Sequence, residues 1–291
     1  NVLSIQSWVC HGYVGNKCAV LALQQMGIEV DPINTVQLSN NTAYSAFKGE
    51  SLSAAKLLEI FQTLTTNHLS DNYTHVLTGY NNNAETLRAV LSIVRTLKQA
   101  NPNLTYVCDP VLGDNNKLYV PEDLVDIYRD EVIQHADYLF PNQTEAELLT
   151  GIKINTEADA IMAIDKLHEK GIANVIITSC MVDDCNDEIV VIGGAKGQRK
   201  FRLSVPRIDG YFTGTGDIFS ALLLGWSTRE PNNLALACER SVSTLYNIIK
   251  KTHETKQQIP TSKQGEYYEI RLVQSRHFIG STDVLFKSHN I

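Results

Sequence analysis

Short apolar runs alternate with longer segments whose apolar residues recur at helical spacing. The runs predict strands at residues 2–6, 29–37, 74–78, 105–109, 138–140 and 174–178. The helical spacing predicts helices at residues 17–26, 53–64, 84–100, 144–150 and 157–170. This alternation predicts an α/β fold with a doubly wound, mostly parallel central sheet, helices on both faces and three α/β/α layers.

The pattern changes in the last third of the chain. Residues 189–193 and 200–205 predict a hairpin-type pair of strands, and residues 217–228 and 232–250 predict two helices. The acidic run 183–188 lies between the predicted strands at 174–178 and 189–193. It lacks the spacing of a calcium loop and predicts a solvated turn. A polar tail from residue 264 has a short helical pattern at 266–273. No repeat or proline-rich linker divides the chain, so we expect residues 1–291 to form a single domain.

Polar residues directly follow several predicted strands. They are Ser7, Tyr80, Asp109, Asn142 and Ser179. Ligands of doubly wound sheets bind at the carboxyl ends of the strands. We therefore expect these side chains to converge on one site.

The segment Gly214-Thr215-Gly216-Asp217 precedes an apolar helical run. Two glycines allow the N–H groups of a helix start to point outward, which makes an anion site. Asp217 at such a site could accept a proton from a hydroxyl that attacks phosphorus, or it could only favour the helix start. The dinucleotide-binding fingerprint fails because Phe219 stands where a third glycine is required.

Two further acidic segments suit phosphate and magnesium. In the first, Asp109 closes a strand before Pro110, and Asp114 follows a glycine turn. Magnesium prefers a few carboxylates together with water and phosphate oxygens, although a capped surface turn explains this segment equally well. In the second, Asn142 opens a helix with Glu145 in its first turn, either as a cap or to hold metal-bound water. Similarly, the glycine loop after Ser7 could be a plain β–α connection with Asn16 as the helix cap.

Composition narrows the function classes. The chain of 291 residues has a net charge of −7, which argues against broad binding to nucleic acid or anionic membranes. No apolar run approaches the roughly 20 residues of a membrane span. Six scattered cysteines suggest reduced core thiols, and the chain opens on a strand-like run without a signal or transit pattern, so we expect a cytosolic protein. No Gly-x-x-x-x-Gly-Lys-Ser/Thr loop is present, so any use of ATP follows another scheme.

Taken in order, these segments resemble the ribokinase-like superfamily and, within it, the pyridoxal kinase family. The resemblance runs from residue 2 to about residue 251. Its most specific stretch is Gly12-Tyr13-Val14-Gly15-Asn16, and the other stretches that carry it are residues 4–7, 36–42, 78–80, 109–114, 119–122, 141–148 and 214–217. Asn41 stands where the family often carries a histidine, and Leu38 where it often carries a phenylalanine. These two differences bear on which substrate of the family this chain prefers.

The resemblance implies ATP-dependent phosphorylation of the 5′-hydroxymethyl group of pyridoxal, pyridoxine or pyridoxamine. By this likeness Asp217 is the catalytic base and Gly214, Thr215 and Gly216 form the anion hole. The implied substrate-binding residues are Ser7, which would contact the ring nitrogen, and Val14, Thr42, Tyr80 and Asp217. The implied nucleotide-binding residues are Asp109, Tyr119, Asn142, Thr178, Ser179, Thr215 and Gly216. The implied magnesium-binding residues are Asp109, Asp114 and Glu145. A flap around residues 117–119, a potassium ion near the nucleotide and a homodimer are further implications.

Two other functions remain open from the sequence. A hydroxymethylpyrimidine kinase of the same superfamily would share most of these segments. A binding protein for vitamers or nucleotides could keep the fold without catalysis, although Asp217 between its glycines argues against that. Sugar kinases of the superfamily usually carry an extra β lid early in the chain, and here the first strand runs almost directly into the glycine loop.

Overall fold

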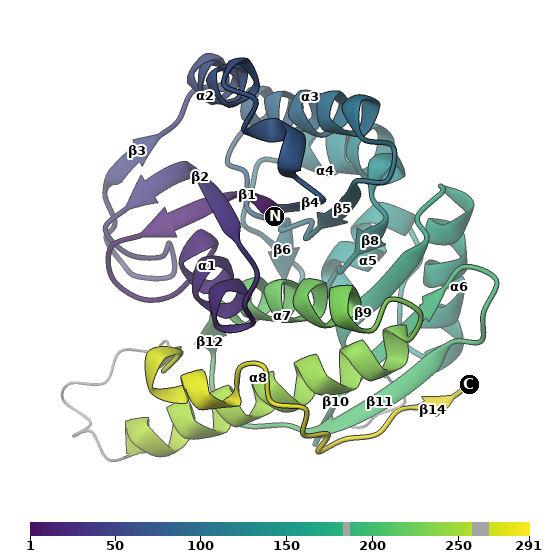
Figure 1. Ribbon diagram of the computed structural model, residues 1–291. Helices are drawn as coiled ribbons and strands as arrows, with labels where there is room; N and C mark the ends of the chain where they lie inside the picture. The colour runs from purple at the N-terminus through teal and green to yellow at the C-terminus, as the bar shows by residue number, and fades with distance from the viewer. Residues whose placement is uncertain (183–186, 258–267) are drawn as a thin grey trace.

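A ten-stranded sheet forms the centre of the fold (Figure 1), in the order β14-β11-β10-β9-β8-β5-β4-β1-β2-β3. The computed structural model describes residues 1–182, 187–257 and 268–291. The parallel strands of the sheet are β1 (Val2–Val9), β2 (Val30–Leu38), β4 (His75–Thr78), β5 (Thr105–Cys108), β8 (Tyr138–Leu139) and β9 (Asn174–Cys180). Each corresponds to a predicted strand, so the predicted parallel sheet is confirmed.

Antiparallel strands complete both edges of the sheet. β10 (Glu188–Ala195) pairs with β9 and with β11 (Phe201–Pro206), which confirms the predicted hairpin-type pair. The outermost strands are short and were not predicted: β3 (Gly49–Ser51) at one edge and β14 (His289–Asn290) at the other. Their residues are exposed.

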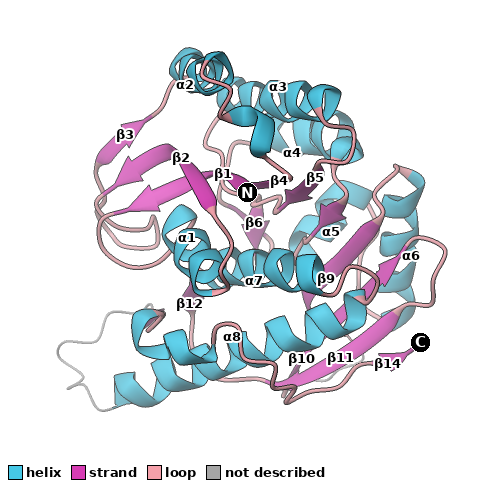
Figure 2. Ribbon diagram, viewed as in Figure 1, coloured by secondary structure: helices cyan, strands magenta, loops and turns pink. Residues whose placement is uncertain are grey.

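Helices cover both faces of the sheet (Figure 2). Five contribute to one apolar cluster: α2 (Ala54–Thr66), α3 (Ala84–Ala100), α4 (Asp123–Ile127), α5 (Gln143–Thr150) and α6 (Glu157–Glu169). Three contribute to a second cluster on the other face: α1 (Asn16–Gln25), α7 (Thr215–Arg229) and α8 (Leu234–Gln257). Along β5, Tyr106 and Cys108 enter the first cluster and Val107 the second, as the alternation of a strand requires. The three-layer architecture is confirmed.

The chain reverses direction across the sheet at β1. It passes from β1 to β2 on one side, then returns through α2 to β4 on the other side of β1. This is a topological switch point, where doubly wound sheets form a crevice outside the carboxyl ends of their strands. The polar residues expected to converge lie on the carboxyl-terminal parts of β1 and β9 or just after β4, β5 and β8.

The helices and cysteines of the described residues can be compared with the expectations from composition. Within the parts of the chain that the structure describes, no helix has the combined length and apolarity needed to cross a membrane. The described cysteines, Cys10, Cys18, Cys108, Cys180 and Cys238, are free thiols, and all but Cys10 are buried. Cys185 lies outside the described residues.

The start of α1 differs from the plain connection, capped by Asn16, that the sequence left open. Gly15, at φ 54°, is the residue that precedes the helix, and Asn16 is its first residue. The Asn16 side chain is fully buried and donates to Ile33 O at 3.0 Å and to Asn34 Oδ1 at 2.8 Å. Asn16 as a helix cap is therefore wrong, because its amide ties α1 to β2 instead.

Several short elements were not predicted. β6 (Gly113–Asp114) and β7 (Lys117–Leu118) form a hairpin, and α4 continues through a π-helix (Tyr128–Val132) into a 3-10 helix (Ile133–His135). A 3-10 helix (Ser70–Asn72) precedes β4. β12 (Phe212–Thr213) pairs in parallel with β13 (Tyr268–Glu269).

The helix expected at residues 266–273 is wrong where the structure describes it. Residues 268 and 269 form β13, and a 3-10 helix (Val273–Phe278) starts only at the last residue of the expected span. Residues 266 and 267 lie outside the described residues, as do residues 183–186 of the acidic run. Glu188, at the end of that run, is the first residue of β10.

Candidate active site

The N-terminus of α7 is open. Gly214 precedes the helix in the left-handed region, at φ 81°, and its N-terminus has no side-chain cap. Ile218 donates the first helical bond, to Gly214 O at 3.1 Å. The N–H groups of residues 215–217 therefore have no partner within the helix and carry its partial positive charge.

The glycine loop after β1 packs directly against this terminus. A Cβ atom on Gly214 would lie 2.0 Å from Tyr13 O, and one on Gly15 would lie 2.4 Å from Ser7 Oγ. The Gly15 N–H also donates to the carboxylate of Asp217. Ser7 and Asp217 come from distant parts of the chain and meet on either side of Gly15, where only glycine leaves room.

Asp109 and Asp217 form an acidic pair beside the open terminus. The Asp109 side chain is buried and accepts a hydrogen bond from Ser220 Oγ at 2.8 Å. Burial and the nearby Asp217 carboxylate raise the pKa of Asp109 to about 7. Burial also raises the pKa of Asp217, against the hydrogen bond from Gly15. Desolvation is the larger of these two effects, so the carboxylate of Asp217 holds a proton more readily than an exposed aspartate.

The N-terminus of α5 is closed by its own side chains. Asn142 accepts from Glu145 N at 2.9 Å, and Glu145 Oε2 accepts from Asn142 N at 2.8 Å, which completes a capping box. Glu145 Oε1 accepts from Leu112 N at 3.0 Å. Burial and the Asp109 charge raise the pKa of Glu145 well above its usual value. The Asn142 side chain also donates to Gly113 O at 2.7 Å, which joins α5 to the β6–β7 hairpin.

These acids suit a magnesium ion that is shared with phosphate. Among the residues described, no three His, Cys, Asp or Glu side chains form a metal-holding group. The predicted trio Asp109, Asp114 and Glu145 is therefore not such a group, and Asp114 accepts from Asn115 N at 2.8 Å on the hairpin. The charge of Asp109 nevertheless raises the pKa of Glu145, and the charge of Asp217 raises that of Asp109. A cation would offset this excess of negative charge. A site with few protein ligands is what magnesium accepts when phosphate and water supply the rest.

The predicted substrate-binding residues surround the switch point. Ser7 is buried on β1, and Val14 and Tyr80 are half-buried in the loops after β1 and β4. Thr42 is exposed in the loop after β2. Its neighbour Asn41 is buried and reaches toward Thr213, with Asn41 Nδ2 3.5 Å from Thr213 Oγ1. The loops after β1 and β2 therefore meet the segment that leads into Gly214.

The predicted flap is the β6–β7 hairpin and the residue after it. Asn115 and Asn116 form its two-residue turn, both at positive φ, as a tight hairpin with right-handed twist requires. The Tyr119 hydroxyl lies 2.8 Å from that of Tyr211, just before β12. Thr178 and Ser179 lie at the carboxyl end of β9, where Thr178 N donates to Pro141 O at 2.9 Å, next to Asn142.

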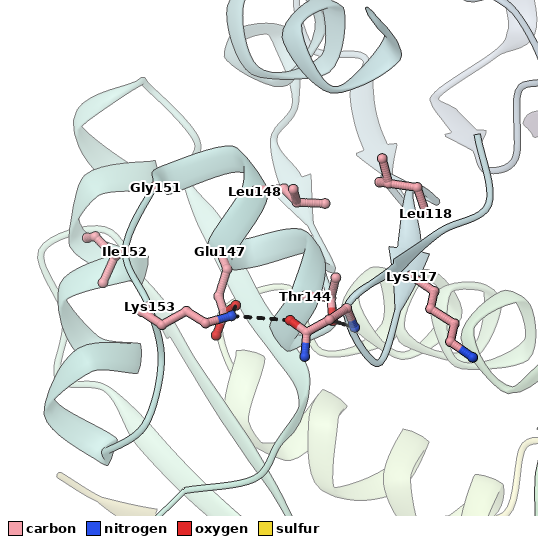
Figure 3. A pocket seen from close by; sticks show the side chains of 9 residues that line it. Lys117, Leu118, Thr144, Glu147, Leu148, Gly151, Ile152 and Lys153 are labelled. Carbon is pink, nitrogen blue, oxygen red and sulfur yellow. Dashed lines mark hydrogen bonds and ion pairs between the residues drawn. The ribbon is translucent and has the colours of Figure 1, made fainter. Parts of the chain in front are cut away.

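A cavity of about 310 Å³ lies beside the flap, between the hairpin and α5 (Figure 3). Lys153 forms an ion pair with Glu147 and donates to Asn116 Oδ1 at 3.2 Å across its rim. The other lining residues are Lys117, Leu118, Thr144, Leu148, Gly151 and Ile152. Of the predicted residues, Lys117 and Leu118 of the flap line this cavity, and the predicted catalytic, substrate-binding, nucleotide-binding and metal-binding residues do not.

Sequence reasoning missed two contributors and undervalued Asn41. Ser220 lies one helical turn after Asp217, and a polar residue within the apolar run of α7 was the signal for it. Glu269 accepts from Asn41 Nδ2 at 2.8 Å, but no motif marks it. Its neighbours come from segments that are distant in sequence, so only the folded chain reveals it.

The switch point, the open helix terminus and the acidic pair together define a phosphotransferase of the ribokinase-like fold. Residues 43–262 match a family model described as phosphomethylpyrimidine kinase. A pyridoxal kinase of Dictyostelium discoideum is 60% identical over 100% of this chain and 99% of its own length. One of Arabidopsis thaliana is 45% identical over 99% of this chain and 93% of its own. The chain belongs to the pyridoxal kinase family.

Solved structures agree with this assignment. The pyridoxal kinase of Leishmania donovani, in complex with ADP and pyridoxamine, is 33% identical and superposes with a TM-score of 0.91. The match covers 100% of this chain and 99% of that one. The ribokinase-like fold expected from the sequence is thereby confirmed.

Proposed function

We propose that this chain transfers the γ-phosphoryl group of ATP to the 5′-hydroxymethyl group of pyridoxal, and also of pyridoxine and pyridoxamine. The relatives named pyridoxal kinase and the complex of one of them with ADP and pyridoxamine support this. The observation that carries it is the open terminus of α7 with Asp217 in its first turn and Ser7 across Gly15. The hydroxymethylpyrimidine alternative has the description of the family model in its favour, but not the full-length relatives.

Asp217 is the general base. It takes the proton as the substrate oxygen forms its bond to phosphorus, while ADP leaves with the electron pair of the broken bond. The raised pKa of Asp217 makes its carboxylate a better proton acceptor than an exposed aspartate. The N–H groups of Thr215 and Gly216 and the terminus after Gly214 stabilise charge on the transferred group.

Asp109 and Glu145 are the residues that would hold a magnesium ion, with Asp114 on the adjacent hairpin. When bound, magnesium neutralises charge on the phosphate oxygens. Nucleotide binding is assigned to Asp109, Tyr119, Asn142, Thr178, Ser179, Thr215 and Gly216, and the vitamer pocket to Ser7, Val14, Thr42, Tyr80 and Asp217. The likeness to the family also supports a potassium ion near the nucleotide.

We further propose that residues 1–291 act as a single kinase domain in a cytosolic homodimer. The continuous sheet from β3 to β14 supports one domain, and the free thiols suit a reducing compartment. The homodimer rests on the likeness to the family. Light scattering of the purified protein measures its mass, and a monomer at all concentrations would contradict the homodimer.

One parallel assay tests the activity. ATP consumption is measured with pyridoxal, pyridoxine, pyridoxamine, hydroxymethylpyrimidine, ribose and adenosine, each with magnesium and potassium present. We expect the vitamers to be phosphorylated with the highest kcat/KM. Turnover of hydroxymethylpyrimidine alone would favour the runner-up, and nucleotide binding without turnover of any substrate would favour a binding protein.

A further inference from the structure

Glu269 places a carboxylate between the segments that line the substrate pocket. Its Oε2 atom accepts from Tyr13 N at 3.3 Å and from Thr213 Oγ1 at 3.3 Å. Its Oε1 atom accepts from Asn41 Nδ2 at 2.8 Å. Tyr13 is 256 residues away in the sequence, so β13 brings this carboxylate to the loops after β1 and β2 from the far end of the chain.

The glycine loop is shaped to receive this carboxylate. Gly12 adopts φ 84°, and a Cβ atom there would lie 2.2 Å from Glu269 Oε2. The Tyr44 hydroxyl is a further donor: burial and then the Glu269 charge and hydrogen bond raise the pKa of Tyr44. One carboxylate therefore has neutral donors from the loop after β1, from the loop after β2 and from β12.

Glu269 is anchored independently of the pocket. In the β12–β13 pair, Glu269 stands opposite Thr213. The next residues belong to the core that also holds α7, since Ile270 and Leu272 are both buried there. Arg271 N donates to Thr252 Oγ1 of α8 at 2.9 Å. The carboxylate is thus presented from a segment that is anchored in the core by the residues after it.

The residue whose N–H group Glu269 holds also contacts the catalytic terminus. Tyr13 N donates to Glu269, while Tyr13 O packs against Gly214, where no Cβ would fit. Thr213, the other partner, immediately precedes Gly214. We propose that Glu269 is a positioning residue, which holds the glycine loop and Asn41 in the arrangement that presents the alcohol substrate to Asp217. The proposal rests on the proposed function of this site.

The test compares Glu269→Ala and Glu269→Gln with Glu29→Ala, a control at an exposed glutamate away from the site. Glutamine keeps the shape and one acceptor oxygen, so it should restore part of what alanine loses, because its NH2 group cannot accept from Asn41 or Tyr13. For alanine we expect the KM of pyridoxal to rise about tenfold, as loss of these hydrogen bonds would give, with the KM of ATP within about twofold. Deuterium uptake of the ligand-free protein should also increase in residues 10–16 and 39–44.

The two readouts separate the inference from the proposed activity. Uptake is measured without substrate, so faster exchange in both loops supports the positioning role even if another alcohol proves to be the substrate, and the KM comparison is then made with that alcohol. Unchanged deuterium uptake overturns the inference. It is also overturned if Glu269→Ala and Glu269→Gln both raise the KM values of the alcohol and of ATP together and both lower the melting temperature. Absence of pyridoxal turnover by the unaltered protein contradicts the proposed function alone.

Discussion

Helices α5 and α7 both start at the carboxyl edge of the sheet with an acid in the first turn, yet their termini are built differently. In α5 the Asn142 side chain caps the helix, and both Glu145 oxygens accept backbone N–H groups. In α7 Gly214 provides no side-chain cap, and the carboxylate of Asp217 receives the N–H of Gly15, from outside the helix. The acid alone is therefore uninformative, and the residue before the helix decides whether its donors are available.

The two termini also differ in what they join. The cap of α5 reaches the β6–β7 hairpin through Asn142 and Gly113, so it organises neighbouring backbone. The terminus of α7 meets the glycine loop through a contact with Tyr13 O that excludes any side chain. The α5 terminus is closed by its own side chains, and the α7 terminus leaves its backbone donors uncapped beside the carboxylate of Asp217.

The largest effect should come from removing the carboxylate of the open terminus. Asp217→Asn keeps the size of the side chain but cannot accept the proton of the alcohol. We expect kcat to fall by roughly 10²-fold or more, with the melting temperature nearly unchanged. Asp159→Asn, which alters a first-turn acid in the capped helix α6, is the control and should leave kcat unaltered. Near-normal turnover of Asp217→Asn would show that the carboxylate at the α7 terminus is not the general base.

A smaller effect is expected from crowding the open terminus. Gly214→Ala adds a Cβ at φ 81° that would lie 2.0 Å from Tyr13 O. Displacement of the glycine loop should lower kcat by on the order of tenfold to a hundredfold. Gly151→Ala is matched, because Gly151 has φ 71° and nothing within 4 Å of its Cβ position. It should lower the free energy of unfolding by about 1 to 2 kcal/mol and leave kcat intact. Equal kinetics in both variants would show that the close contact at Gly214 is unimportant.

The smallest effects concern the capped helices and appear in stability. Asn142→Ala removes the bonds to Glu145 N and Gly113 O, and should lower the free energy of unfolding by about 2 kcal/mol. Thr156→Ala removes an exposed capping box of α6 and should cost about 1 kcal/mol. Urea unfolding measures both. Because Asn142 is also assigned to nucleotide binding, the variant should raise the KM of ATP as well, and an unchanged KM would contradict that assignment.

Local patterns predicted the regular part of the fold well. Period and composition located the parallel strands and their helices, because the two faces of each buried strand alternate between the two apolar clusters. The β6–β7 hairpin escaped because its strands are two residues long and only the Asn115-Asn116 turn marks it. The C-terminal helix was predicted wrongly because Tyr268 and Glu269 pair with the distant β12, a contact that overrides local propensity.

The site shows the same division. Gly214 to Asp217 could be located because a glycine-flanked acid before an apolar helix is a local signal. The pKa of Asp217 could not, because its direction depends on burial produced by the fold. Glu269 was inaccessible to sequence reasoning for the same reason, since its partners Tyr13, Asn41 and Thr213 meet only in three dimensions.

The two outermost strands have a consequence for how the molecule behaves among its own copies. A sheet edge is a row of unpaired backbone groups onto which another chain can add. Here each edge finishes in an exposed strand of three residues, β3, or two residues, β14, and Ile291 N still donates to Lys200 O beside it. Strands this short offer a neighbouring molecule little ladder to extend at β3 and β14 themselves, which disfavours edge-to-edge addition of another copy there.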